Sequence, residues 1–175
     1  LRGRLEAKGR VHGGLGLAQL IVDTRISGSD WTFFGERFRS VRFSGGYASG
    51  GYTMRDLEAR KRSGAITGGI SFDSKGRFDW KFLSRDFTLR DLDAMLRLAI
   101  PIRGDLQISS EGSGTLQSLE SSTRVSLSRT VIRSLSFPSS SLEVNSSQGA
   151  WSATGNGFGD QLRLDWSQDP GSSGQ

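Results

Sequence analysis

The stretch Phe78-Asp-Trp80-Lys-Phe82 decides the fold, because aromatic and charged residues alternate along it. Successive side chains of an extended strand point to opposite faces, so the stretch predicts a strand with one apolar and one charged face. The same period of two recurs along most of the chain. It appears at Leu20-x-Val22, Val41-x-Phe43, Ile66, Ile70-x-Phe72, Leu106-x-Ile108, Val125-x-Leu127, Leu142-x-Val144 and Leu162-x-Leu164. An all-β chain is therefore predicted.

Glycine accounts for 24 of the 175 residues and proline for only 3, which is typical of turns and bulges rather than of a disordered linker. Hairpin signals between the apolar runs indicate an antiparallel sheet of sequential hairpins. These signals are Gly45-Gly46, Gly50-Gly51, Asp73 to Gly76, Glu111-Gly112 and Gln148-Gly149. One short helix at most is expected, at 89–98, where Ile100-Pro101 would end a helical stripe of Leu and Met.

An internal repeat has a period near 36 residues. The segment Tyr52-Thr-Met-Arg-Asp-Leu-Glu-Ala59 returns as Phe87-Thr-Leu-Arg-Asp-Leu-Asp-Ala94. The frame apolar-x-apolar also returns in equal steps, from Ile70 to Leu106 to Leu142. A period in this range is typical of repeat arrays, in which each unit packs on its neighbours. We therefore expect Ile70, Leu106 and Leu142 to occupy equivalent positions on one face of the sheet, and Phe72, Ile108 and Val144 likewise.

The expected domain is a single repetitive β domain over 1–167, followed by a flexible tail over 168–175 rich in Gly and Ser. The sequence starts at Leu1, with no signal peptide or membrane-spanning run, which we interpret as a fragment of a larger protein. The net charge of +5 comes from arginines spread along the chain. This spread favours a solubilising surface and predicts no nucleic-acid partner.

The sequence shows no set of residues in a pattern typical of a catalytic or metal site. His12 is the only histidine, and it stands beside Gly13-Gly14 in an expected loop with no nucleophile paired to it. Cysteine is absent, so thiol chemistry and a Cys or His metal set are not expected. The aspartates are predicted on polar strand faces and turns. We expect neither an enzyme nor a cofactor.

Three phrases carry a family resemblance: Leu15-Gly-Leu-Ala-Gln-Leu-Ile-Val-Asp23, Gly64-Ala-Ile-Thr-Gly-Gly-Ile-Ser-Phe72 and Gly112-Ser-Gly-Thr-Leu-Gln-Ser-Leu119. They resemble the repeats of TamB and AsmA-like envelope proteins in their short amphipathic strands joined by Gly turns and in their repeat length. The resemblance implies an elongated, curled sheet, described as a taco or half-pipe, whose apolar concave face carries phospholipid or other acyl-chain lipids. It also implies a periplasmic location in a Gram-negative envelope, an inner-membrane anchor elsewhere in the parent protein, and a role in outer-membrane biogenesis.

The residues expected to line the lipid-carrying groove are the apolar members of the alternating runs. They are Leu20, Val22, Val41, Phe43, Ile66, Ile70, Phe72, Phe78, Trp80, Phe82, Leu106, Ile108, Val125, Leu127, Leu142, Val144, Leu162 and Leu164. Alternation does not say what covers an apolar face, so a closed sandwich core is an equal alternative at this point.

Other functions stay open as well. The alternative function is a β-module that binds a client or an outer-membrane barrel partner of the Omp85 type by strand addition. A solenoid adhesin is less favoured because the repeat is long for a solenoid coil. A membrane barrel is less favoured because charges interrupt nearly every predicted strand.

Overall fold

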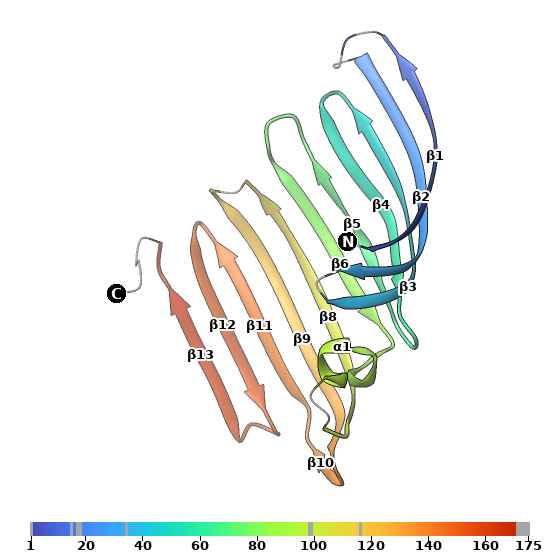
Figure 1. Cartoon of the computed structure of the whole chain (residues 1–175). Helices are drawn as coiled ribbons and strands as arrows, with labels where there is room; N and C mark the ends of the chain where they lie inside the picture. The colour runs from blue at the N-terminus through green and yellow to red at the C-terminus, as the bar shows by residue number, and fades with distance from the viewer. Residues whose placement is uncertain are drawn as a thin grey trace.

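The computed structural model describes residues 2–14, 16, 19–33, 35–97, 100–115 and 117–170, and these form one open antiparallel sheet of 13 strands (Figure 1). The all-β prediction is therefore confirmed. The strands are β1 (Arg2–Gly13), β2 (Leu20–Phe33), β3 (Glu36–Ala48), β4 (Gly51–Arg60), β5 (Ala65–Phe72), β6 (Phe78–Arg85), β7 (Phe87–Thr88), β8 (Ile102–Gly114), β9 (Leu119–Ile132), β10 (Leu135–Phe137), β11 (Ser140–Ser147), β12 (Ala150–Gly157) and β13 (Leu162–Gln168).

The strands lie side by side in chain order, and each pairs antiparallel with the one before it. Two short strands leave this path, because β7 pairs with β8 and β10 pairs with β9. The outer edges of β1 and β13 are the two ends of the sheet. Sequential hairpins are the topology that the turn signals predict.

Two short helical elements lie between β7 and β8, inside the range 89–98 where a short helix was expected. A 3-10 turn, η2 (Leu89–Asp91), is followed by a four-residue helix, α1 (Asp93–Leu96). Leu92 separates them with an extended backbone. The predicted end at Leu98 lies outside the described residues. We call residues 87–97, from β7 through α1, the insertion.

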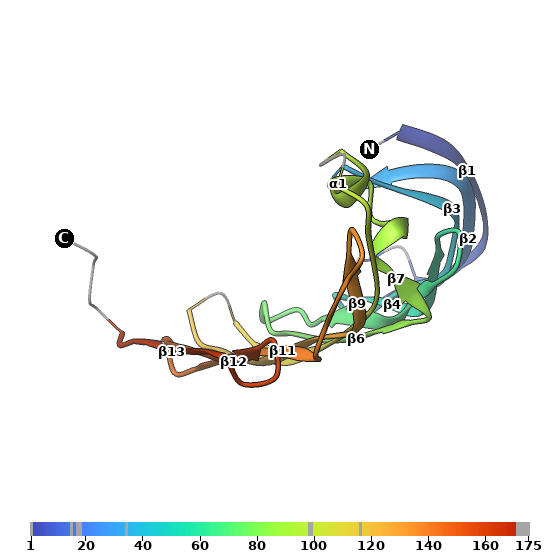
Figure 2. The ribbon, with the colours of Figure 1, turned by 90° about the horizontal axis from the view of Figure 1, so that it is seen from below.

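The sheet curls strongly at its N-terminal end and is flat at its C-terminal end (Figure 2). Register shifts interrupt the pairs β1–β2, β3–β4, β4–β5 and β8–β9. No shift interrupts the pairs that join β9 through β11 and β12 to β13. Because a bulge bends and twists the strand that carries it, the distribution of bulges explains where the sheet curls.

The two faces of the sheet follow from the pairing, since residues directly opposite in neighbouring strands point to the same side. We call the face toward which the N-terminal strands curl, and on which α1 lies, the concave face (Figure 2). The opposite face is the convex face. The residues packed most tightly lie on the concave side, where the insertion meets the sheet: Phe38, Val41, Ala59, Phe87, Leu89 and Leu106.

Two of the expected hairpin turns are wrong. Gly45-Gly46 lies inside β3 and Glu111-Gly112 inside β8, whereas turns do occur at Gly50, at Asp73 to Gly76 and at Gln148-Gly149. The glycine inside β8 has a packing role, because a Cβ on Gly112 would stand 2.5 Å from the Trp80 ring. An aromatic ring lying over a strand glycine is a common way to cover the exposed backbone.

The alternating runs missed three strands on the main path of the sheet and misplaced one residue. They included none of β1, β4 and β12: β4 carries a bulge that interrupts its alternation, and the concave positions of β1 and β12 are largely Ala, Gly and other small residues. His12 lies within β1 and not in a loop, and its side chain is exposed on the convex face.

The 36-residue repeat places equivalent residues on the same face of the sheet, but not at the same level along the strands. Ile70, Leu106 and Leu142 lie on β5, β8 and β11, which are every second strand of the ladder, and all three side chains are concave. Phe72, Ile108 and Val144 are concave too. Ile70, however, stands level with Gly112, whereas Leu142 stands level with Ile108. The expected equivalence of position is wrong, because the strands are staggered unequally.

The sheet of the described chain is continuous from β1 to β13, and the last strand ends at Gln168, the first residue of the expected tail. Residues 171–175 lie outside the described residues.

Candidate functional site

The concave face is the candidate site, because the ladder places all eighteen predicted lining residues on it. The pairs Val22 with Tyr47, Val41 with Ala59 and Ile66 with Ala59 illustrate how the assignment passes from strand to strand. Among the described strands, Glu36 is the only acidic or basic residue on this face, where it lies on the side of the core residue Phe38 and contacts Lys61. Everything else charged on the ladders lies on the convex face.

One end of the concave face is covered by the insertion. Phe87 and Leu89 are 4% and 5% exposed and pack with Val41 and Leu106 in the core cluster. Seven of the predicted lining residues belong to this covered end: Val41, Phe43, Ile66, Leu106, Ile108, Val125 and Leu127. For these seven, the closed-core alternative describes their environment.

A buried ion cluster anchors the insertion to the sheet. The Lys61 side chain, only 3% exposed, forms ion pairs with Glu36 and with Asp93 at 3.0 Å. Its ammonium also donates to the backbone oxygen of Asp91 at 2.8 Å and lies over the Phe38 ring, 5.4 Å from the centroid. Because a buried cation is costly unless it is paired, this arrangement fixes where the insertion sits.

Both carboxylates of this cluster have lowered pKa values. Burial acts to raise the pKa of Glu36, but hydrogen bonds from Lys61 and from the backbone N–H groups of Asp93 and Ala94 outweigh it and lower the pKa. The backbone N–H of Arg37 donates to Asp93 at 2.6 Å and, together with Lys61, lowers the pKa of Asp93 despite its partial burial. Both groups therefore stay ionised under neutral conditions.

The rest of the concave face is open and aromatic. Tyr47 and Tyr52 meet across β3 and β4 with ring centroids 4.8 Å apart, above a shallow hollow of about 450 Å³ lined also by Leu20 and Val22. Phe78 stacks on Trp80 at 5.7 Å and meets Phe72 at 5.8 Å. The other eleven predicted lining residues lie in this open part: Leu20, Val22, Ile70, Phe72, Phe78, Trp80, Phe82, Leu142, Val144, Leu162 and Leu164.

A strip of hydroxyl groups crosses the open part without adding charge. The Trp80 indole N–H donates to Ser110, and Ser110 pairs with Thr123 at 2.9 Å. Ser121 pairs with Ser146 at 3.1 Å, and Ser146 also donates to the Leu119 carbonyl. These hydroxyls satisfy one another, so the strip presents little unmet hydrogen-bonding demand.

Several concave residues were not predicted as lining although they belong to the same surface. Leu5 and Val11 of β1, Tyr52, Trp151 and Trp166 are 54%, 68%, 61%, 40% and 46% exposed. The alternating run Leu162-x-Leu164-x-Trp166 already contains Trp166, and Tyr52 follows the same period of two, so both could have been included. Leu5, Val11 and Trp151 alternate with Ala and Gly, which weaken the apolar signal.

Among the described residues there is no group of three or more His, Asp or Glu side chains that could hold a metal ion. None of the helices described is long and apolar enough to cross a membrane. Comparisons of the chain with protein-family models, with curated proteins and with solved structures gave no match.

Proposed function

We propose that the open part of the concave face holds the acyl chains of phospholipids or similar lipids. The observation that carries the proposal is the separation of charge between the two faces. Large apolar side chains stay exposed on the concave face, with Tyr52, Phe72 and Trp166 at 61%, 44% and 46%. Contiguous exposed apolar surface of this kind marks a binding surface in folded proteins.

The energetics suit a carrier more than a tight binding site. Each buried CH₂ of an acyl chain contributes about 0.8 kcal/mol, so a chain gains affinity from length and not from one contact. A charged headgroup has no ionic partner on the open part of this face, and it stays at the rim in water. Lipids held in this way can move from one strand to the next, because no single residue dominates the binding.

We further propose that the chain is a segment of a longer lipid-carrying sheet in the periplasm of a Gram-negative cell. Two things support this: the resemblance to TamB and AsmA-like repeats, and the unpaired outer edges of the sheet, of which the β1 edge could take up more strands of the parent protein. In this proposal the parent protein is anchored in the inner membrane and supports outer-membrane biogenesis. The chain has no catalytic role and needs no cofactor.

The experiment is transfer of a phospholipid with a fluorescent acyl chain from vesicles to the purified protein. Phe72→Glu places a charge on the open concave face, whereas Gln107→Glu adds the same charge to the convex face of β8. We expect lipid uptake by the wild type and by Gln107→Glu, and at least several-fold less by Phe72→Glu, because a carboxylate beside an acyl chain has no partner.

Thermal unfolding of both variants must match the wild type for the comparison to count, which is expected because Phe72 is 44% exposed. Absence of lipid uptake by the wild type, or equal uptake by the two well-folded variants, would show that the concave face is not a lipid-binding surface.

A second candidate function is strand addition to an outer-membrane barrel partner of the Omp85 type, supported by the same free edges. Its test is direct binding between this chain and such a barrel, with a photo-crosslinker at Lys8 on edge strand β1 and, as control, at Thr67 on interior strand β5. Crosslinking from Lys8 alone is expected, whereas equal or absent crosslinking contradicts edge binding.

A further inference from the structure

The outer edge of β13 is flatter and more regular than the outer edge of β1. All seven residues of β13 are exposed, the strand has no bulge or proline, and it lies in the flat part of the sheet (Figure 2). The β1 edge belongs to the curled part and carries a register shift and an ion pair between Glu6 and Lys8. A flat, regular edge is the kind that accepts another strand.

On the convex face, charge pairs join neighbouring strands in three places. In three ladders an acid stands directly opposite a base and forms an ion pair with it. The pairs are Arg42 with Glu58, Lys81 with Glu111 and Arg124 with Glu143. Opposite charges across strands favour one register, and like charges oppose it. The convex face thus uses charge pairs between strands to fix their alignment.

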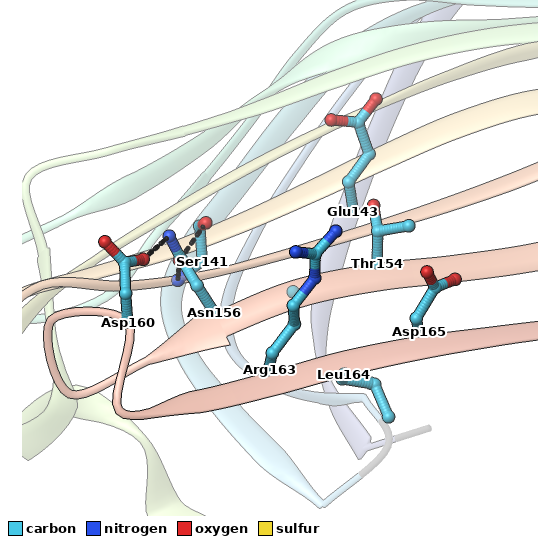
Figure 3. Close-up of a pocket in the computed structure, with 9 residues that line it drawn as sticks. Ser141, Glu143, Thr154, Asn156, Asp160, Arg163, Leu164 and Asp165 are labelled. Carbon is cyan, nitrogen blue, oxygen red and sulfur yellow. Dashed lines mark hydrogen bonds between the residues drawn. The ribbon is translucent and has the colours of Figure 1, made fainter.

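Strand β13 has no such charge pair with its neighbour. Its convex charges, Arg163 and Asp165, stand opposite Asn156 and Thr154 of β12, which are uncharged. In the part of the chain that the structure describes, neither charged side chain forms a hydrogen bond or an ion pair. Figure 3 shows Arg163 and Asp165 on the same side of the sheet as Glu143 and Thr154, and no hydrogen bond joins either of them to the other residues drawn, whereas Asn156 is bonded to Ser141 and Asp160.

We propose that the partner of the β13 edge is β13 of a second copy of this chain, paired antiparallel about a two-fold axis at Leu164. In this register Arg163 stands opposite Asp165 of the second copy, and Asp165 opposite Arg163 of the second copy. Both charges are thereby paired, as in the three ladders with ion pairs. The inference does not depend on lipid binding.

The concave side of the same register is also complementary. Leu164 meets its own copy, and Leu162 stands opposite Trp166 of the second copy, so side chains that are 45%, 58% and 46% exposed become covered. Because the axis is perpendicular to the sheet, the two concave faces join into one surface. A single strand pair is a small interface, so a weak dimer that depends on concentration is expected.

The first test is sedimentation of the purified chain over a range of concentrations. Arg163→Asp and Asp165→Arg each place like charges opposite one another twice, and we expect each to weaken the dimer about tenfold. The double variant Arg163→Asp with Asp165→Arg restores both opposite pairs and is expected to recover the wild-type dimer. A wild type that stays monomeric, or a double variant no better than the single ones, overturns the proposal.

The second test uses the absence of cysteine from the chain, which makes any introduced thiol unique. Leu164→Cys lies on the two-fold axis, where directly opposite Cβ atoms are close enough for a disulfide. Ser167→Cys, on the same strand, lies away from the axis and is the control. We expect a crosslinked dimer from Leu164→Cys alone. A dimer that forms without this crosslink, or crosslinks equally at Ser167, uses a different surface and contradicts the assignment.

Discussion

At the residue scale, Lys61 is the side chain whose role is hardest to predict from the sequence. It stands between Arg60 and Arg62 in a basic run that is expected to be solvated. In the structure it is buried and joins β3, through Glu36, to the insertion, through Asp93 and Asp91. No local pattern reveals this role, because its partners lie 25, 30 and 32 residues away in sequence.

Lys61→Met should destabilise the fold by about 3 kcal/mol, because it leaves the Glu36 and Asp93 carboxylates close together without their cation. The measurement is urea unfolding at neutral pH. Lys81→Met is the matched control, since the ion pair of Lys81 with Glu111 is exposed and we expect its loss to have no measurable effect. Equal effects of the two substitutions would contradict an anchoring role for Lys61.

The same cluster makes the stability sensitive to acid. The pKa values of Glu36 and Asp93 are lowered in the folded chain, so these groups stabilise it above their unfolded pKa values, near pH 4. This contribution is lost as the pH falls through the lowered values and the carboxylates are protonated. Lys61→Met removes one cause of the lowering, so the stability of this variant should fall less steeply than that of the wild type below about pH 4.

At the element scale, the alternation of apolar and polar residues predicted most strands and the face of every lining residue. Its errors have physical causes. Gly45-Gly46 and Gly112 look like turns, but within strands they make room for neighbouring Thr and Trp side chains. The split of the concave face into a covered and an open part was not predictable, because the insertion docks through long-range contacts that periodicity does not encode.

The insertion offers a direct comparison between a buried and an exposed leucine. Leu89→Ala should cost about 3 kcal/mol of folding free energy, because Leu89 is 5% exposed in the core cluster. Leu96→Ala, in α1 of the same insertion, should change stability by less than about 0.5 kcal/mol, because Leu96 is 64% exposed. Thermal or urea unfolding measures both. If Leu89→Ala unfolds like Leu96→Ala, the insertion is not part of the core.

At the scale of the whole molecule, curvature determines whether an apolar face becomes a hollow or a flat surface. Asp56 is the extra residue in two ladders at once. The single residue between Arg42 and Ser44 of β3 faces two residues of β4. The single residue between Gly68 and Ile70 of β5 also faces two residues of β4, and Asp56 is one of the two in both ladders. Its φ of 54° bends the strand at this point. The flat C-terminal ladders have no such residue.

Deletion of Asp56 should therefore flatten the sheet without changing its faces. Met54 and Leu57 would become separated by Arg55 alone, so both would stay concave and the ladder would become regular. We expect a folded protein with a larger maximum dimension in small-angle X-ray scattering, and weaker retention of a fluorescent acyl chain if curvature helps to cover it. Deletion of Thr53, a regular residue of the same strand, is the control, because it turns Tyr52 to the convex face and should destabilise the chain. A scattering profile unchanged by loss of Asp56 would show that the curl has another origin, such as the docking of the insertion, which deletion of Asp56 leaves in place.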